Sequence, residues 1–97
     1  MDPTARVGIA WYREDQWQLL RAVAPDSHGL GPTYSAWEKV ASEQIWELEN
    51  QGLAVQRVDV DLTELLPWCH IKGLSPDAAA RNRFAQEKLA LGANPAL

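Results

Sequence analysis

Three acidic residues in the second half of the chain have the types and spacing that could support chemistry. Asp59 and Asp61 alternate with apolar residues along a predicted strand, and Glu64 follows where that strand ends. Open parallel sheets bind ligands at this end of their strands. Carboxylate oxygens placed there can hold Mg²⁺ for chemistry on a phosphorylated or nucleotide-like ligand. Asp59, Asp61 and Glu64 are therefore the candidate metal ligands of a divalent-metal-dependent enzyme.

The same acidic residues also have a simpler interpretation, which the sequence favours. Alternation along a half-buried strand already predicts polar side chains at these positions, and an acidic residue near a helix start is favoured by the helix dipole. Neither a glycine-rich phosphate loop nor a catalytic lysine motif accompanies them. A solvated strand face leading into a helix is the favoured prediction, and Mg²⁺ is expected only under the enzyme alternative.

Cys69 and His70 are adjacent and could be read as a nucleophile with its base. Neighbouring residues on a helix point about 100° apart, so the two side chains do not face each other. Buried cysteine is common as a small apolar residue, which is the prediction for Cys69. With His28, the two histidines and one cysteine have no metal-ligand spacing.

Five tryptophans are unusual for a chain of 97 residues. Three fall on predicted buried faces: Trp11, Trp17 and Trp37. The pattern does not place Trp46 and Trp68 clearly on a buried face, and exposed aromatic residues mark binding surfaces. Together with Phe84 of the last predicted helix, Trp46 and Trp68 are the candidate interface residues.

Basic residues on the last predicted helix could form a small patch of Arg81, Arg83 and Lys88. Asp77 and Arg81 are four residues apart, as are Arg83 and Glu87, so each pair can form along one helix face. The prediction is a solvated helix face, and nucleic-acid binding is not expected.

Two short segments are predicted to position these residues. Val7–Trp11 is apolar on both faces, and residues 56–62 alternate with the period of a half-buried strand. Leu53 and Val55 are out of phase with the apolar residues that follow, so the second strand either starts late or contains a bulge near residues 56–57.

Helical patterns fill the remainder of the chain. Four helices are predicted, over residues 14–24, from Thr33 or Ser35 to about residue 51, from Thr63 to residue 72, and from Ser75 to about residue 91. The last of these has only a thin apolar edge, which predicts a helix that is half exposed or covered by a second subunit.

The predicted element order is β-α-α-β-α-α, in one α/β domain over residues 1–97 with loose termini at 1–5 and 93–97. A long helical crossover between the two strands favours parallel pairing. Two parallel strands make a poor sheet alone. A homodimer that extends the sheet or covers its edge is therefore a hypothesis.

Composition excludes several classes of protein. The apolar share of 46% and charged share of 23% are those of a globular domain. A net charge of −4 argues against generic binding to nucleic acid or anionic membrane. The start of the chain is neither a signal peptide nor a lipidation site, and no apolar run approaches the roughly 18 residues of a membrane helix. A cytoplasmic location is the default expectation.

Several motifs between Val7 and Lys88 resemble a group of small uncharacterised bacterial proteins. These motifs are Gly8-Ile9-Ala10-Trp11-Tyr12, Thr33-Tyr34…Trp37, Trp68-Cys69…Gly73-Leu74 and Ala80-Arg81…Phe84-Ala85…Glu87-Lys88. The resemblance implies a bacterial cytoplasmic protein and transfers no site residues.

The favoured functional hypothesis is a non-enzymatic interaction module that binds a protein partner or a second copy of itself. Its surface would lie near Trp46, Trp68 or the last helix. The alternative is the metal-dependent enzyme that uses Asp59, Asp61 and Glu64.

Overall fold

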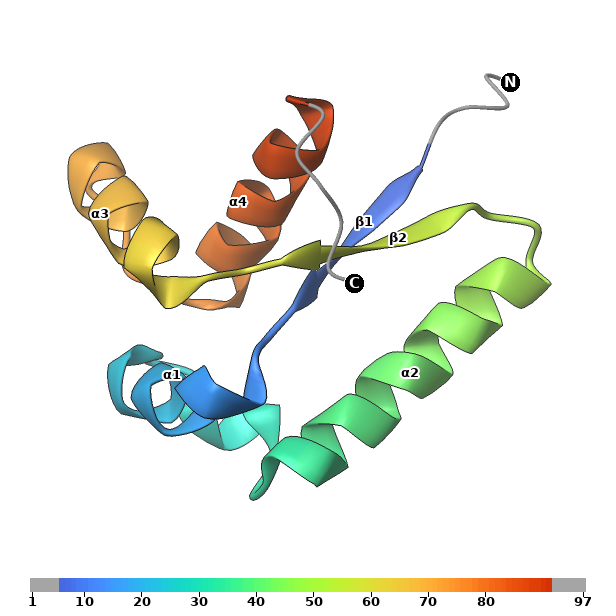
Figure 1. The fold of residues 1–97 in the computed structure, drawn as a ribbon, viewed down its shortest axis with the longest axis horizontal. Helices are drawn as coiled ribbons and strands as arrows, with labels where there is room; N and C mark the ends of the chain where they lie inside the picture. Colours follow the sequence, from blue (N-terminus) through green and yellow to red (C-terminus); the bar gives the residue numbers. More distant parts are fainter. Residues whose placement is uncertain (1–5, 92–97) are drawn as a thin grey trace.

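The computed structural model describes residues 6–91, which form the predicted small α/β fold (Figure 1). The elements are β1 (Val7–Trp11), α1 (Trp17–Val23), α2 (Tyr34–Asn50), β2 (Val55–Asp59), α3 (Leu62–Lys72) and α4 (Ala78–Ala90). Short 3-10 turns, Glu14–Gln16 and Ser27–Leu30, flank α1. The predicted order β-α-α-β-α-α is confirmed. The predicted loose termini lie outside the described residues.

The two strands pair in parallel, as predicted, with a register that runs from Val7 opposite Val55 to Trp11 opposite Asp59. The predicted bounds of the second strand were wrong, because β2 ends at Asp59 and Leu62 is already the first residue of α3. The register is continuous, so β2 contains no bulge. The apparent phase change arises because Leu53 precedes the strand and is exposed, while Val55 is half-buried on the face that it shares with Arg57 and Asp59.

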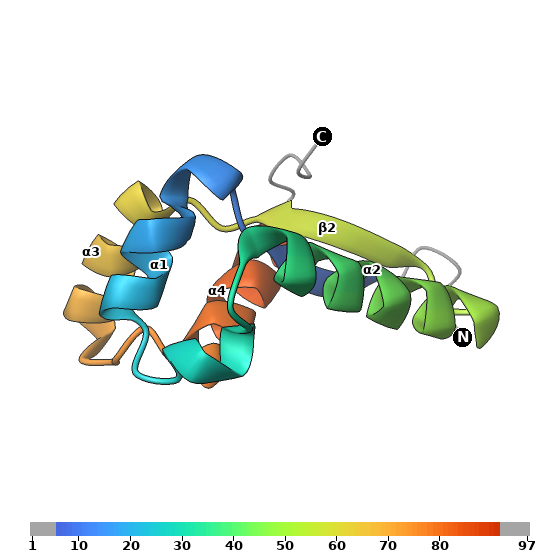
Figure 2. The same ribbon diagram turned by 90° about the horizontal axis from the view of Figure 1, so that it is seen from below.

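Helices α2 and α4 lie on opposite faces of this sheet (Figures 1 and 2). Gly8 faces α4, since a Cβ atom at Gly8 would lie 3.0 Å from the Gln86 Oε1 atom and 3.1 Å from a Leu89 methyl group. Trp11 faces the other way, with its ring centroid 4.9 Å from that of Trp37 in α2. The molecule therefore has a helix–sheet–helix arrangement.

The core lies mainly between the sheet, α1, α3 and α4. Its most deeply buried side chains are Leu20, Val58, Val60, Leu62 and Leu65. The predicted burial is confirmed for Trp17, whereas Trp11 and Trp37 are half-buried. Cys69 is buried as predicted, and this burial raises the pKa of its thiol.

Helix α4 corrects two predictions. It was expected to be half exposed, but Ala80, Phe84 and Ala85 are buried and the helix packs on β1. Gly8 in β1 and the alanines of α4 are small, so the helix and the strand can approach closely. Few large apolar side chains are then needed to fill the space between them. Leu91, just beyond α4, is 86% exposed.

The second correction concerns Arg81, which was expected on a solvated face. Arg81 is only 2% exposed, and its guanidinium forms two hydrogen bonds with the carboxylate of Asp26, at 2.8 and 3.0 Å. Its expected partner, Asp77, instead caps α4 by accepting a hydrogen bond from the Ala80 N–H. The predicted pair between Arg83 and Glu87 is present at 3.1 Å.

Side-chain caps fix where the helices begin. Thr33, one of the two predicted caps, accepts from the Ala36 N–H at the start of α2. Asp61, and not Thr63, caps α3. Gly73 ends α3 with a φ of 70°, a conformation that favours glycine. Within the described residues, none of the helices has both the length and the apolar character needed to cross a membrane.

Candidate functional site

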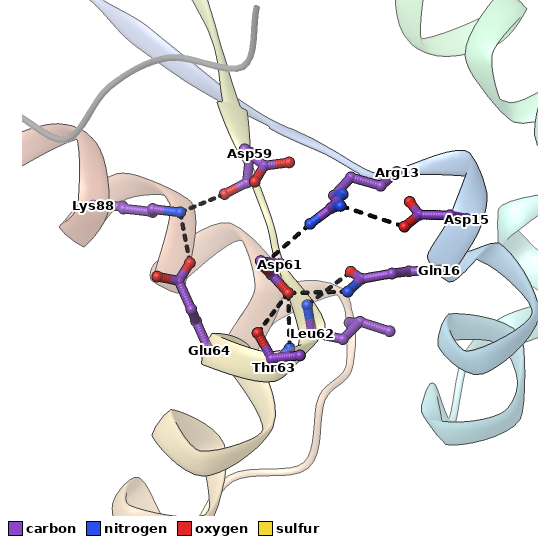
Figure 3. Close-up of polar contacts among 9 residues, drawn as sticks. All are labelled: Arg13, Asp15, Gln16, Asp59, Asp61, Leu62, Thr63, Glu64 and Lys88. Carbon is purple, nitrogen blue, oxygen red and sulfur yellow. Dashed lines mark hydrogen bonds and ion pairs between the residues drawn. The ribbon is translucent and has the colours of Figure 1, made fainter.

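The three acidic residues of the candidate metal site lie where β2 ends, but each serves a different contact (Figure 3). Asp59 is the last residue of β2, Asp61 caps α3, and Glu64 lies in the first turn of α3. Across residues 6–91, no group of three His, Cys, Asp or Glu side chains could hold a metal ion. The geometry therefore does not favour the metal-site prediction.

Asp61 is fully engaged by hydrogen-bond donors. Its Oδ1 atom accepts from the Gln16 Nε2 at 2.9 Å, the Thr63 N–H at 2.9 Å and the Thr63 hydroxyl at 2.8 Å. Its Oδ2 atom lies 3.2 Å from Arg13. The hydrogen bonds from Gln16 and Thr63, aided by the charge of Arg13, lower the pKa of Asp61 to about 2.

Gln16 joins the segment after β1 to the start of α3. While its amide nitrogen donates to Asp61, its carbonyl oxygen accepts from the Leu62 N–H at 2.9 Å. This residue was missed from the sequence, where nothing distinguishes it from other polar residues near the start of a helix. Only the register of the two strands brings Gln16 next to Asp61.

Lys88 of α4 closes the other side of this cluster (Figure 3). Its ammonium group donates to Glu64 at 2.8 Å and to the main-chain carbonyl of Asp59 at 2.8 Å. Partial burial raises the pKa of the Asp59 carboxyl, while the charges of Lys88 and Arg13 act to lower it. Arg13 pairs with Asp15 and Asp61, and Lys88 pairs with Glu64. The cluster therefore acts as a structural junction between the segment after β1, the end of β2, α3 and α4.

Replacing Asp61 with alanine is expected to cost about 0.5–2 kcal/mol of stability, the usual range for a lost helix cap. The charge adds a pH dependence. The pKa of the Asp61 carboxyl is lower in the folded protein than in the unfolded chain. The stabilisation that its charge contributes is therefore present above pH ~4 and is lost as the pH falls through about 2. Urea unfolding of the wild type and Asp61→Asn should show a stability difference that shrinks over this range. Asp15→Asn, whose side chain is 67% exposed, serves as the control, and a difference independent of pH would contradict the prediction.

The three candidate interface residues have different environments. Trp46 on α2 is 64% exposed. Phe84 is only 8% exposed and belongs to the core, while Trp68 is half-buried against it with ring centroids 5.4 Å apart. Of the three, only Trp46 therefore presents a large free surface. His70 is exposed beside the buried Cys69, so the two do not form a nucleophile–base pair.

A groove beside β1 was not identified from the sequence. It has a volume of about 500 Å³ and lies between α2, the 3-10 turn Ser27–Leu30 with the residues after it, and the Asn82 side of α4. The larger apolar side chains of its lining are Ile9, Leu30, Pro32, Trp37 and Val40, and no charged residue lines it. Tyr12 also lines the groove, and burial raises the pKa of its phenol.

The floor of the groove is the free edge of β1. The Val7 N–H donates to the Ala54 carbonyl at 2.8 Å, and the Trp11 carbonyl accepts from the Val60 N–H at 2.9 Å. Peptide groups alternate in direction along a strand. The odd-numbered residues of β1 therefore bond to β2, and the even-numbered residues direct their peptide groups toward the groove.

Side chains already cover part of this edge. Gln86 donates to the Gly8 carbonyl at 2.6 Å, and the Tyr34 hydroxyl donates to the Tyr12 carbonyl at 2.9 Å. Between them, the same alternation directs the N–H and C=O of Ala10 away from β2, and no side chain of the described residues bonds to either group. The open edge is thus short and centred on Ala10.

Comparison of the chain with protein-family models, curated proteins and solved structures finds no match. The resemblance to small bacterial proteins stays a prediction.

Proposed function

We propose that this protein is a non-enzymatic binding module whose groove beside β1 takes a short, uncharged, apolar peptide segment of a partner in an extended conformation. The observation that supports it is the open peptide edge of Ala10 at the floor of an apolar groove. Strand edges with unpaired N–H and C=O groups bind extended peptides by adding a strand.

The dimensions of the groove set the size of the ligand. A volume of about 500 Å³ lies within the range typical of small ligand pockets and accommodates a few side chains. Gln86 and Tyr34 close the strand edge on both sides of Ala10, so the added strand is limited to a few residues. Apolar side chains of the ligand would contact Trp37 and Val40, while its backbone would bond to Ala10.

The charge of the groove sets the ligand's chemistry. Its polar side chains are Tyr12, Gln44 and Asn82, all neutral at physiological pH. A charged segment would lose its hydration without gaining a counter-ion there, which is unfavourable.

Selection from a library of random peptides displayed on phage tests this proposal. We expect the enriched peptides to share a short uncharged apolar stretch and to shift the amide resonances of Ala10, Trp37 and Val40 in the ¹⁵N-labelled protein. Enrichment of charged peptides, or shifts confined to the Asp61 cluster, would contradict the proposal.

Val40→Glu provides the matched variant. Val40 is 54% exposed at the rim of the groove, so a carboxylate there should leave the fold intact and weaken binding of a selected peptide at least 10-fold. Ile71→Glu is the control, because Ile71 is 82% exposed on α3, away from the groove. Titration by isothermal calorimetry should show equal affinity for the wild type and Ile71→Glu. Unchanged affinity in Val40→Glu would place the binding site elsewhere.

A further inference from the structure

The second strand also has an open edge, on the side away from the groove. The Ala54 carbonyl and the Val60 N–H bond to β1. By alternation, the peptide groups of Val55, Arg57 and Asp59 point away from β1. The Asp59 carbonyl accepts from Lys88, and no side chain within residues 6–91 bonds to the other main-chain N–H and C=O groups of these three residues.

We propose that a second copy of this chain pairs antiparallel along this edge, so that the two β2 strands form the centre of a four-stranded sheet. The pairing places Arg57 opposite Asp59 of the partner subunit, and the reverse. In this register the Asp59 carbonyl, which accepts from Lys88, accepts a second hydrogen bond from the main chain of the second copy. This interface is distinct from the groove beside β1 and does not depend on what the groove binds.

Charge complementarity selects the second copy and its register. Arg57 is exposed and Asp59 is half-buried, and both side chains lie on the same face of the sheet because they are two residues apart. Opposite charges placed directly across antiparallel strands stabilise the pair, while like charges destabilise it. A shift of the register that placed the two Arg57 side chains opposite each other is therefore disfavoured.

Helix α2 supplies a second contribution to the same interface. Ala41 and Ile45 are the buried residues of α2. Val40 precedes Ala41 and Trp46 follows Ile45, so at about 100° per residue they lie on opposite flanks of the helix. Since Val40 lines the groove along β1, Trp46 lies on the flank toward β2. A two-fold axis through the β2 pair would bring the two α2 helices side by side and cover Trp46.

The dimer also widens the sheet. Two strands alone are marginal, and packing against helices or additional strands stabilises them. In the proposed assembly, α2 and α4 continue to cover the faces of a sheet twice as wide.

Sedimentation velocity on charge variants tests this interface. The wild type is expected to be a dimer at micromolar concentration, whereas Arg57→Glu and Asp59→Lys are each expected to be monomers because both positions then carry one sign of charge. An equimolar mixture of the two variants should restore a dimer, since opposite charges again face each other at both positions. Lys72→Glu on α3 is the control for a charge change outside the interface, and it should remain dimeric.

Three outcomes would overturn the proposal: a monomeric wild type, variants that stay dimeric, or a mixture that stays monomeric while both variants keep the circular dichroism of the wild type. If either charge variant fails to fold, Trp46→Ser decides the question, because it should shift the dimerisation midpoint to at least 10-fold higher concentration. An unchanged midpoint would contradict the interface. Val40→Glu should leave dimerisation unchanged, which separates this proposal from the groove.

Discussion

Replacing Arg81 with alanine is expected to destabilise the fold by about 2–4 kcal/mol, because it removes a buried guanidinium and its charged hydrogen bonds. The cost is below that of a fully buried ion pair, since the Asp26 side chain is 37% exposed and regains water. The expected loss is a large part of the roughly 5–15 kcal/mol that stabilises a typical domain. Besides its bidentate contact with Asp26, Arg81 donates to the Tyr12 hydroxyl at 2.6 Å and to the Pro76 carbonyl at 2.9 Å. The substitution leaves these acceptors without donors and opens a cavity between α4 and the end of β1.

The planar guanidinium is required for this arrangement. Arg81→Lys keeps the charge but cannot hold Asp26 in a bidentate contact while also reaching Tyr12, so we expect an intermediate loss of stability. Urea unfolding measures each variant. Arg83→Ala is the control, because Arg83 forms only an exposed pair with Glu87 and should cost less than about 1 kcal/mol. Equal stabilities of Arg81→Ala and Arg83→Ala would contradict this account of the core.

The ion pair between Arg81 and Asp26 also predicts that the stability of the fold depends on pH. The hydrogen bonds from Arg81 lower the pKa of Asp26 below its usual 3.8. Stability from this pair is therefore present above pH ~4 and is lost as the pH falls through the lowered pKa. The stability of wild type should fall more steeply below pH 4 than that of Arg81→Ala.

Leu65→Ala is expected to cost about 2–5 kcal/mol, because removing a buried leucine side chain loses burial and leaves a cavity. Leu65 is 0% exposed in α3, which the Asp61 cap and Gln16 position against the core. Leu19→Ala is the matched control, since Leu19 is 47% exposed on α1 and should change stability by less than about 1 kcal/mol. Urea unfolding should show these losses with an unchanged m value. A loss below about 1 kcal/mol for Leu65→Ala would mean that α3 is not anchored as described.

The fold was predictable because its signals are local. The alternation around Val58 and Val60 marked a strand, and the glycines after α2 and α3 marked helix ends. The crossover length then indicated parallel pairing. The predicted end of the second strand was wrong because an aspartate fits both a strand face and a helix cap. Asp61 continued the polar–apolar alternation of the strand, although it is the N-cap of α3.

The contacts that depend on distant residues could not be predicted in this way. Arg81 and Asp26 are 55 positions apart, and the pairing of Arg81 with Asp77 was the nearer alternative. The groove likewise depends on how the turn ending at Leu30 and the α2 residue Val40 flank the free edge of β1. No periodicity within one segment encodes such a relation, because it arises only from packing.

Hydrogen exchange at the Ala10 amide tests the central claim most directly. The exchange rate is measured in the ¹⁵N-labelled protein, alone and saturated with an uncharged apolar peptide selected as above. If a ligand strand pairs with the free edge of β1, the Ala10 amide should exchange at least 10-fold more slowly in the complex, while the amides of α3 do not change. Unchanged exchange at Ala10 in a saturated complex would show that β1 does not bind the peptide.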